Sequence, residues 1–317
     1  IQSSATGESG ITLSKRFGYV IVVSVLPDSA GAKAGIHSGD IFESIGGFTT
    51  RDMSVGQAMN LLTGQPGTGV KVAVIRRGKA TPDEVDVVRE KLAPAKIVTQ
   101  KAEADTLVLR LISLDSGRAD EIRSRLLDAE KQGVHNVILD LRECGRGQTS
   151  EAISVARLFV PSGTLATLKG QTVSAQVFSA EPKQVVWKGP LSLLIDGSTS
   201  GAAEVLASAI ASNHRGDVVG ERTFGLASEQ KLITLEDGAA LILTTANYYN
   251  PNGKSIIEEG VAPTEVVHST VEDDSDVDDN ATAPKKDLQQ GPRPLSPEDP
   301  IYRKAIDLLK TPAKKAA

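Results

Sequence analysis

The sequence predicts an α/β (α+β) protein in which a small β-barrel-like domain precedes a larger domain of alternating strands and helices. Residues 10–89 hold short apolar runs separated by turn residues, with two compact helical segments between them. From residue 106 onward, apolar runs of strand length alternate with amphipathic helical patterns, which is typical of a sheet with partly parallel strands. A chain of 317 residues also has room for about two domains.

The composition disfavours several classes of partner. Aromatic residues make up only 3% of the chain, so broad stacking surfaces for single-stranded nucleic acid are not expected. The formal net charge of −5 disfavours polyanions in general, and we expect no nucleic acid partner. The sequence contains no run of about 18 apolar residues, so no membrane-spanning segment is visible in it.

Cysteine and histidine usage points to neither a metal nor a cofactor. The single cysteine, Cys144, excludes an internal disulfide framework and a multi-cysteine metal site. The four histidines are scattered and form no close pair of the kind that binds zinc. The chain begins at Ile1 rather than at methionine, so we expect a processed or trimmed product whose targeting segment is out of view.

The first domain is expected to span residues 10–92, after a flexible end at residues 1–9. Strands are predicted at 19–26, 40–45, 70–76 and 85–88, and helices at 30–34 and 54–62. This order closely resembles a PDZ domain of the bacterial, circularly permuted kind. The resemblance rests on three short segments: Ala34-Gly35-Ile36, Gly39-Asp40-Ile41 and the turn Gly64-Gln65-Pro66-Gly67.

This resemblance implies a peptide-binding groove. PDZ domains bind an extended C-terminal peptide at a sheet edge, and their backbone N–H groups hold its carboxylate. The side-chain pocket would be lined by Val55 and Met59, one helical turn apart, although both could equally be core residues. The carboxylate loop would consist of Gly10, Ile11, Thr12 and Leu13.

The second domain is expected to span residues 93–268. A polar connector at 91–104 leads to a strand at 106–111, a helix at 118–131, a strand at 137–141 and a helix at 151–158, with a later strand at 239–247. The acidic and Pro-rich segment 269–298 cannot bury enough apolar surface to fold alone, which predicts a solvated linker or else a docking segment. Residues 299–317 are expected to form a helix and a tail, with Ile301, Ala305 and Leu308 packing back against the domain.

The stretch 195–231 is where a functional site is expected. An apolar strand at 191–195 runs into Gly197 and three hydroxyl residues, and a helical pattern follows at once. The first N–H groups of a helix lack intrahelical partners. The turn can therefore cap its own helix, or it can hold an anion or a developing oxyanion.

Residues 106–263 resemble the catalytic core of the carboxyl-terminal processing peptidases, or tail-specific proteases. Four motifs carry the resemblance, in order: ILDLRECGRG against the family's DLRxNxGG, GSTSGAAE against SASASE, GERTFGLASEQ against GExTFGKGxxQ, and ALILTTANYYNPNGKSI against a strand ending in YxxPxGxxI. The resemblance implies a ClpP/crotonase-like α/β core. It also implies a serine peptidase in which a neutral lysine takes the serine proton and a glutamine positions the lysine.

Aligning the motifs on Glu204 and on Thr223-Phe224-Gly225 reveals an apparently degenerate active site. The position of the nucleophilic serine falls at Gly201 and that of the lysine at Leu226, while the glutamine is present as Gln230. Leucine can neither accept a proton nor become charged, so the loss of the base is the graver change.

Two further features of the site follow from the resemblance. Oxyanion-binding N–H groups would come from Gly145, Gly147 and Ala202, although both glycines could also simply form a tight turn. Ser200 could act as a displaced nucleophile if it found a base, and Lys231, His214 and Glu204 are the candidates. A catalytic role for Cys144 is disfavoured because no histidine is expected beside it.

These observations lead to a main hypothesis and two alternatives. The main one is a pseudo-peptidase that binds polypeptide C-terminal tails through its PDZ domain and scaffolds or regulates an active relative or another copy of itself. The alternatives are an active serine endopeptidase that uses Ser200 and a structural assembly subunit. The family resemblance implies a periplasmic or extracytoplasmic location.

Overall fold

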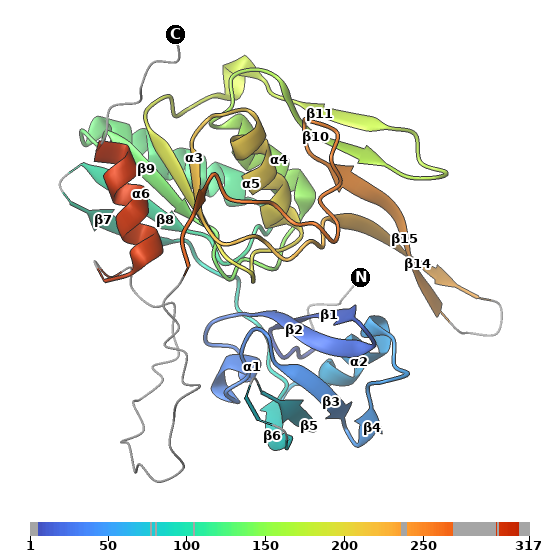
Figure 1. Ribbon diagram of the computed structural model, residues 1–317. Helices are drawn as coiled ribbons and strands as arrows, with labels where there is room; N and C mark the ends of the chain where they lie inside the picture. The colour runs from blue at the N-terminus through green and yellow to red at the C-terminus, as the bar shows by residue number, and fades with distance from the viewer. Residues whose placement is uncertain are drawn as a thin grey trace. The chain divides into compact units, whose positions relative to one another are not determined.

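The structure, a computed structural model, describes residues 6–76, 78–79, 81–103, 105–235, 240–268, 296 and 298–310. The described residues form two compact units (Figure 1). Among the described residues, the first unit comprises those up to residue 93 together with residue 296, and the second comprises those at 94–268 and 298–310. Each unit has its own apolar core, so each is described separately.

The first unit is an antiparallel sheet with two helices. Strands β1 (Ile11–Arg16), β2 (Tyr19–Val25), β3 (Ile41–Ile45), β5 (Gly69–Ile75) and β6 (Asp83–Val88) lie in that order, and β4 (Phe48–Thr49) pairs with β3. Helices α1 (Ala30–Lys33) and α2 (Val55–Leu62) begin at the serine caps Ser29 and Ser54. The core contains Val20, Phe42, Ile45, Leu62 and Val72, all fully buried.

Two expectations for the start of this unit need correction. Residues 7–9 are not a free end, because Gly7 pairs with Gly64, Glu8 pairs with Glu90, and Ser9 is buried. The segment from Ile11 to Leu13, expected as a loop, is the beginning of strand β1. Residues 1–5 lie outside the described part of the chain.

A mainly parallel sheet forms the centre of the second unit. Its order is β16 (Glu265–Val266), β13 (Asp217–Gly220), β12 (Leu191–Ile195), β9 (Asn136–Asp140), β8 (Thr106–Arg110) and β7 (Val98–Ala102). All neighbours are parallel except β7, which pairs with β8 in antiparallel fashion. The expected polar connector at 91–104 therefore contains the edge strand β7. Polar residues are common in such a strand because its outer edge is not covered by another strand.

Helices cover both faces of this sheet. Alternate strand residues such as Leu109, Leu139 and Leu193 share a core with α3 (Arg118–Lys131), α4 (Thr149–Arg157) and α5 (Ala202–Ser212). Helix α6 (Pro300–Lys310) contacts β12 and β13 instead. It buries Ile301, Tyr302, Ala305 and Ile306, whereas Leu308, expected to pack, is only half-buried.

A second, smaller sheet completes this unit and is seen beside α4 and α5 in Figure 1. Its strands are β11 (Gln176–Ser179), β10 (Thr164–Lys169), β15 (Ala240–Tyr249) and β14 (Ser228–Thr234), in that order and all antiparallel. A short 3₁₀ helix, η1 (Pro182–Gln184), follows β11. Of the expected linker 269–298, only residues 296 and 298 are described.

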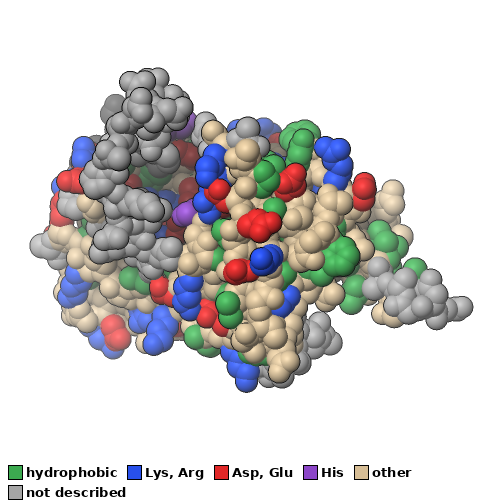
Figure 2. Space-filling model, turned by 90° about the horizontal axis from the view of Figure 1, so that it is seen from below, with side chains coloured by type: hydrophobic (Ala, Val, Ile, Leu, Met, Phe, Trp, Pro, Cys, Tyr) green, Lys and Arg blue, Asp and Glu red, His purple; other side chains and the backbone are tan. Residues whose placement is uncertain are grey.

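Charged side chains of both signs are interspersed over the face shown in Figure 2. In the first unit, Lys33 forms an ion pair with Glu90, and Arg76 forms one with Asp83. Among the described helices, none combines the length and the apolar character that crossing a membrane requires.

Candidate active site

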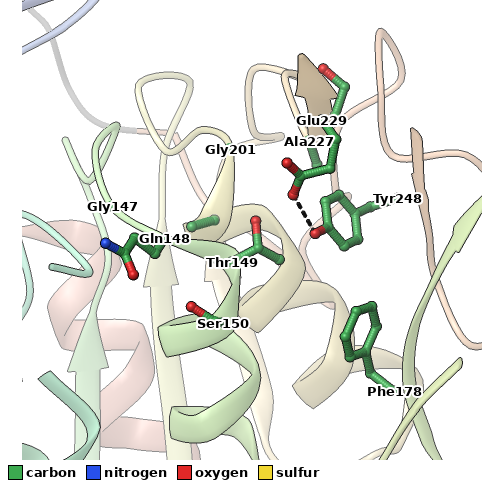
Figure 3. Close-up of a pocket in the computed structure, with 11 residues that line it drawn as sticks. Gly147, Gln148, Thr149, Ser150, Phe178, Gly201, Ala227, Glu229 and Tyr248 are labelled. Atoms are coloured by element: carbon green, nitrogen blue, oxygen red, sulfur yellow. Dashed lines mark hydrogen bonds between the residues drawn. The ribbon is translucent and has the colours of Figure 1, made fainter. Parts of the chain in front are cut away.

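A pocket of about 530 Å³ opens in the second unit between two helix N-termini and three strands (Figure 3). The N-termini of α4 and α5 form one side, and the strands β11, β14 and β15 form the other. Such crevices beyond the carboxyl ends of parallel strands are where α/β proteins place their sites. The lining residues are Gly147, Gln148, Thr149, Ser150, Phe178, Gly201, Ala202, Ala227, Ser228, Glu229 and Tyr248.

Gly201, predicted at the position of the nucleophile, lines this pocket at the start of α5. Its backbone has φ +61° and ψ −119°, a conformation that costs side-chain-bearing residues about 1–3 kcal/mol. A Cβ atom built at Gly201 would have no atom within 4 Å. The site therefore has room for a serine side chain, but glycine supplies no nucleophile and avoids the backbone strain.

The buried carboxylate of Glu204 fixes the geometry around Gly201. One of its oxygens accepts the N–H groups of Gly201 at 2.9 Å and Leu226 at 2.7 Å. The other accepts the Gly225 N–H at 2.6 Å and the Thr223 hydroxyl at 2.5 Å. A single side chain on α5 thus holds the positions predicted for the nucleophile and for the base in one arrangement.

Leu226 occupies the position predicted for the lysine and brings no proton acceptor to the site. Its N–H is bound by Glu204, and the residue is not among those that line the pocket. Among the lining residues, the only ionisable groups are the carboxyl of Glu229 and the phenol of Tyr248.

Gln230, the predicted positioning residue, lies on β14 and is exposed rather than in the pocket. The pairing between β14 and β15 shifts between Glu229 and Gln230, which is the mark of a β-bulge. Glu229 lines the pocket, and its carboxylate accepts the Tyr248 hydroxyl at 2.6 Å. The glutamine present in the motif is therefore not brought to the candidate site.

Two of the three residues predicted to bind an oxyanion line the pocket. Gly147 has φ +131°, and a Cβ there would lie 2.5 Å from the carbonyl oxygen of Leu114, so only glycine fits. Ala202 is the first residue of α5, and its N–H is one that a helix leaves without an intrahelical partner. Gly145 lies in the same loop as Gly147 but not in the lining.

Ser200 is buried, with 2% of its surface exposed, and does not line the pocket. Its N–H donates to the Cys144 carbonyl, and its hydroxyl oxygen has no hydrogen-bond partner among the described residues. The Glu204 carboxylate is occupied by its four donors. His214 lies beyond the far end of α5, and Lys231 is exposed on β14. None of the three candidate bases is within hydrogen-bond distance of the Ser200 hydroxyl.

Burial has the largest effect on the pKa values of Cys144, Asp196 and Glu204. It raises the pKa of the Cys144 thiol far above its usual value, so this cysteine is a poor nucleophile. It raises the pKa of the Asp196 carboxyl to about 6, although the Glu143 N–H and the Thr199 hydroxyl oppose the shift. It also raises the pKa of Glu204 against the four hydrogen bonds to its carboxylate.

Eight residues of the lining were not predicted as site residues, namely Gln148, Thr149, Ser150, Phe178, Ala227, Ser228, Glu229 and Tyr248. The rings of Phe178 and Tyr248 lie 6.2 Å apart at 34°. Four of them, Ala227, Ser228, Glu229 and Tyr248, stood inside the recognised motifs, and that was their only signal. In the part of the chain that the structure describes, no group of three or more His, Cys, Asp or Glu side chains could hold a metal ion.

The groove predicted for the first unit has the expected elements. Strand β1 forms one edge of the sheet, and α2 contacts β1. Val55 and Met59 are half-buried on α2 and pack against the core, so the structure is compatible with both interpretations given above. Gly10, with φ +76°, precedes β1, and a Cβ there would lie 2.3 Å from Ser29.

Replacement of Glu204 tests its structural role. Glu204→Ala leaves three backbone N–H groups and one hydroxyl without acceptors, so we expect a loss of about 3–5 kcal/mol in the free energy of unfolding. Urea unfolding followed by Trp187 fluorescence measures it, because this sole tryptophan is buried in the second unit. Glu130→Ala, on the exposed face of α3, is the control, with a change within about 0.5 kcal/mol. Equal free energies of unfolding for Glu204→Ala and Glu130→Ala would contradict the structural role of Glu204.

Comparison with known proteins agrees with this geometry. A model of peptidase family S41 matches residues 105–267, and a PDZ domain model matches residues 1–75. The carboxy-terminal-processing protease of Bartonella bacilliformis is 30% identical over 266 residues, which are 82% of this chain and 61% of that protein. The carboxyl-terminal-processing protease of Synechocystis sp. is 27% identical over 318 residues, covering 98% of this chain and 70% of that protein.

The solved structures include a similar fold. A photosystem II D1 C-terminal processing protease superposes with a TM-score of 0.77 at 26% identity, covering 84% of this chain and 74% of the other. The match to the protease of Bartonella bacilliformis covers 61% of that protein, so this chain spans less than two thirds of its length. Since the family model covers half of the chain, and the relatives and the fold agree with it, the protein belongs to peptidase family S41 and carries a PDZ domain.

Proposed function

We propose that this protein is a pseudo-peptidase that binds polypeptide C-terminal tails and does not cleave them. One observation carries the proposal: the positions of the serine and the lysine are occupied by Gly201 and Leu226, and no hydrogen bond joins the serines of the lining, Ser150 and Ser228, to the carboxylate of Glu229. The relatives are named for processing carboxyl termini. This chain would handle the same kind of substrate without the chemical step.

The chemistry supports the loss of turnover. A serine hydroxyl is a weak nucleophile near neutral pH unless a base within about 3 Å takes its proton. The Ser200 hydroxyl is buried, has no described hydrogen-bond partner and lies outside the pocket lining. Loss of a serine and its base together typically costs about six orders of magnitude in rate.

Features that bind a peptide without reacting are retained. Gly147 and Ala202 line the pocket with backbone N–H groups that can donate to a peptide carbonyl. In the first unit, β1 is an edge strand that an extended tail can join, and Val55 and Met59 lie on the neighbouring helix. The proposal therefore gives the protein a tail-binding PDZ domain and a pocket that holds a peptide segment.

Restoring the lost pair tests this proposal. The double variant Gly201→Ser/Leu226→Lys returns the family's serine and lysine to a site with room for a serine side chain, so we expect cleavage of an unstructured substrate such as denatured casein. The wild-type protein and both single variants are expected to remain inactive because the pair acts as a unit. Gel and mass-spectrometric analysis of the products measures turnover. Wild-type cleavage that disappears in Ser200→Ala would contradict the proposal and support a displaced nucleophile.

A charge in the PDZ groove tests tail binding. Val55→Asp places a carboxylate where an apolar side chain of the tail is expected, so the affinity for peptides with a free apolar C-terminus should fall at least about 10-fold. Asn60→Asp adds the same charge on an exposed position of α2 and is the matched control. Fluorescence anisotropy with labelled peptides gives both affinities. Unchanged peptide affinity in Val55→Asp would contradict the proposed contact between Val55 and the bound tail and favour the interpretation that Val55 is a core residue.

A further inference from the structure

Glu229 is a carboxylate that the family motifs leave unspecified and that the structure places in the pocket. It is the only acidic side chain of the lining, and the lining contains no lysine, arginine or histidine to neutralise it. The residue is half-buried, so its charge is partly shielded from water. A charge in such a setting interacts more strongly with a ligand than an exposed one does.

Tyr248 holds one oxygen of this carboxylate and leaves the other available. The phenol donates to Oε1 of Glu229 at 2.6 Å, as the dashed line in Figure 3 shows. The second oxygen, Oε2, accepts no hydrogen bond from any described residue. Burial, together with the bond to Glu229, raises the pKa of Tyr248, so the phenol remains a neutral donor. The carboxylate is thereby oriented with one oxygen unused.

The apolar residues of the lining suit a long ligand side chain with an apolar stem. Phe178 and Tyr248 form an aromatic pair, and Ala202 and Ala227 add small apolar surface. Aromatic faces attract cations as well as methylene groups. Lysine and arginine combine such a stem with a positively charged end.

We propose that the pocket selects a basic residue, lysine or arginine, of the bound polypeptide, with Glu229 as the residue that determines this specificity. The inference rests on the proposed function, since it names the side chain that the peptide-holding pocket accepts. The stem of the lysine or arginine side chain would lie along the aromatic pair of Phe178 and Tyr248, and its charged end would donate a hydrogen bond to Oε2 of Glu229.

A pair of peptides that differ in one charge tests the inference. Both are short, fluorescein-labelled and amidated at the C-terminus, so the PDZ groove has no carboxylate to capture. One carries a central lysine and the other norleucine, which has a similar stem without the charge. Anisotropy titrations up to millimolar protein should give about 10- to 100-fold tighter binding of the lysine peptide. Raising the ionic strength from 0.05 to 0.5 M should reduce this preference.

Variants of the pocket residues test whether Glu229 causes the preference for the lysine peptide. Glu229→Gln keeps the size of the side chain and should remove the preference, while Tyr248→Phe removes the orienting bond and should weaken it. Glu259→Gln removes an exposed charge outside the lining and should leave it unchanged. Trp187 fluorescence verifies that each variant is folded.

The outcomes separate the two proposals. Equal binding of both peptides by the wild-type protein, or a lysine preference that persists in Glu229→Gln, overturns the selection of a basic residue and leaves the pseudo-peptidase proposal standing. Binding of neither peptide overturns the selection and also the claim that this pocket holds a peptide. Cleavage of either peptide contradicts the pseudo-peptidase proposal, whatever the preference.

Discussion

The second unit depends on one buried side chain, Glu204. Its carboxylate binds donors from two separated segments, the turn at Gly201 and the loop from Thr223 to Leu226. A buried carboxylate is tolerated only when such donors compensate for the lost water, and loss of the acceptor would leave several buried polar groups unsatisfied. The relative placement of α5 and the segment that enters β14 therefore follows from this single residue, and so does one end of the pocket.

The hydrogen bonds to Glu204 can hold this geometry whichever side chains stand at positions 201 and 226. Three of the four donors to Glu204 are backbone N–H groups, which do not depend on the side chains at positions 201 and 226. Replacing serine with glycine at position 201 also removes the strain of a side chain at φ +61°. The pocket geometry is therefore compatible with glycine at position 201 and leucine at position 226.

Much of the fold could be predicted from the sequence because its strongest patterns are local. The bounds of α3 and β12 were predicted to the residue, since an amphipathic period and an apolar run define them. Strands β7 and β14 were missed because edge strands carry polar residues, as in Val98–Ala102 and Ser228–Thr234. The motifs located Gly147, Gly201 and Ala202 at the pocket. They did not single out Glu229, because its place in the lining depends on how β14 packs against the rest of the second unit, where Gln230 is exposed.

We propose that no serine of the second unit is activated as a nucleophile. Labelling with a fluorophosphonate probe, followed by peptide mapping, measures this directly, because the probe reacts with serines that have a base beside them. We expect no labelled serine in the wild-type protein under conditions that label the Gly201→Ser/Leu226→Lys variant at position 201. Stoichiometric labelling of wild-type Ser200 would contradict the account.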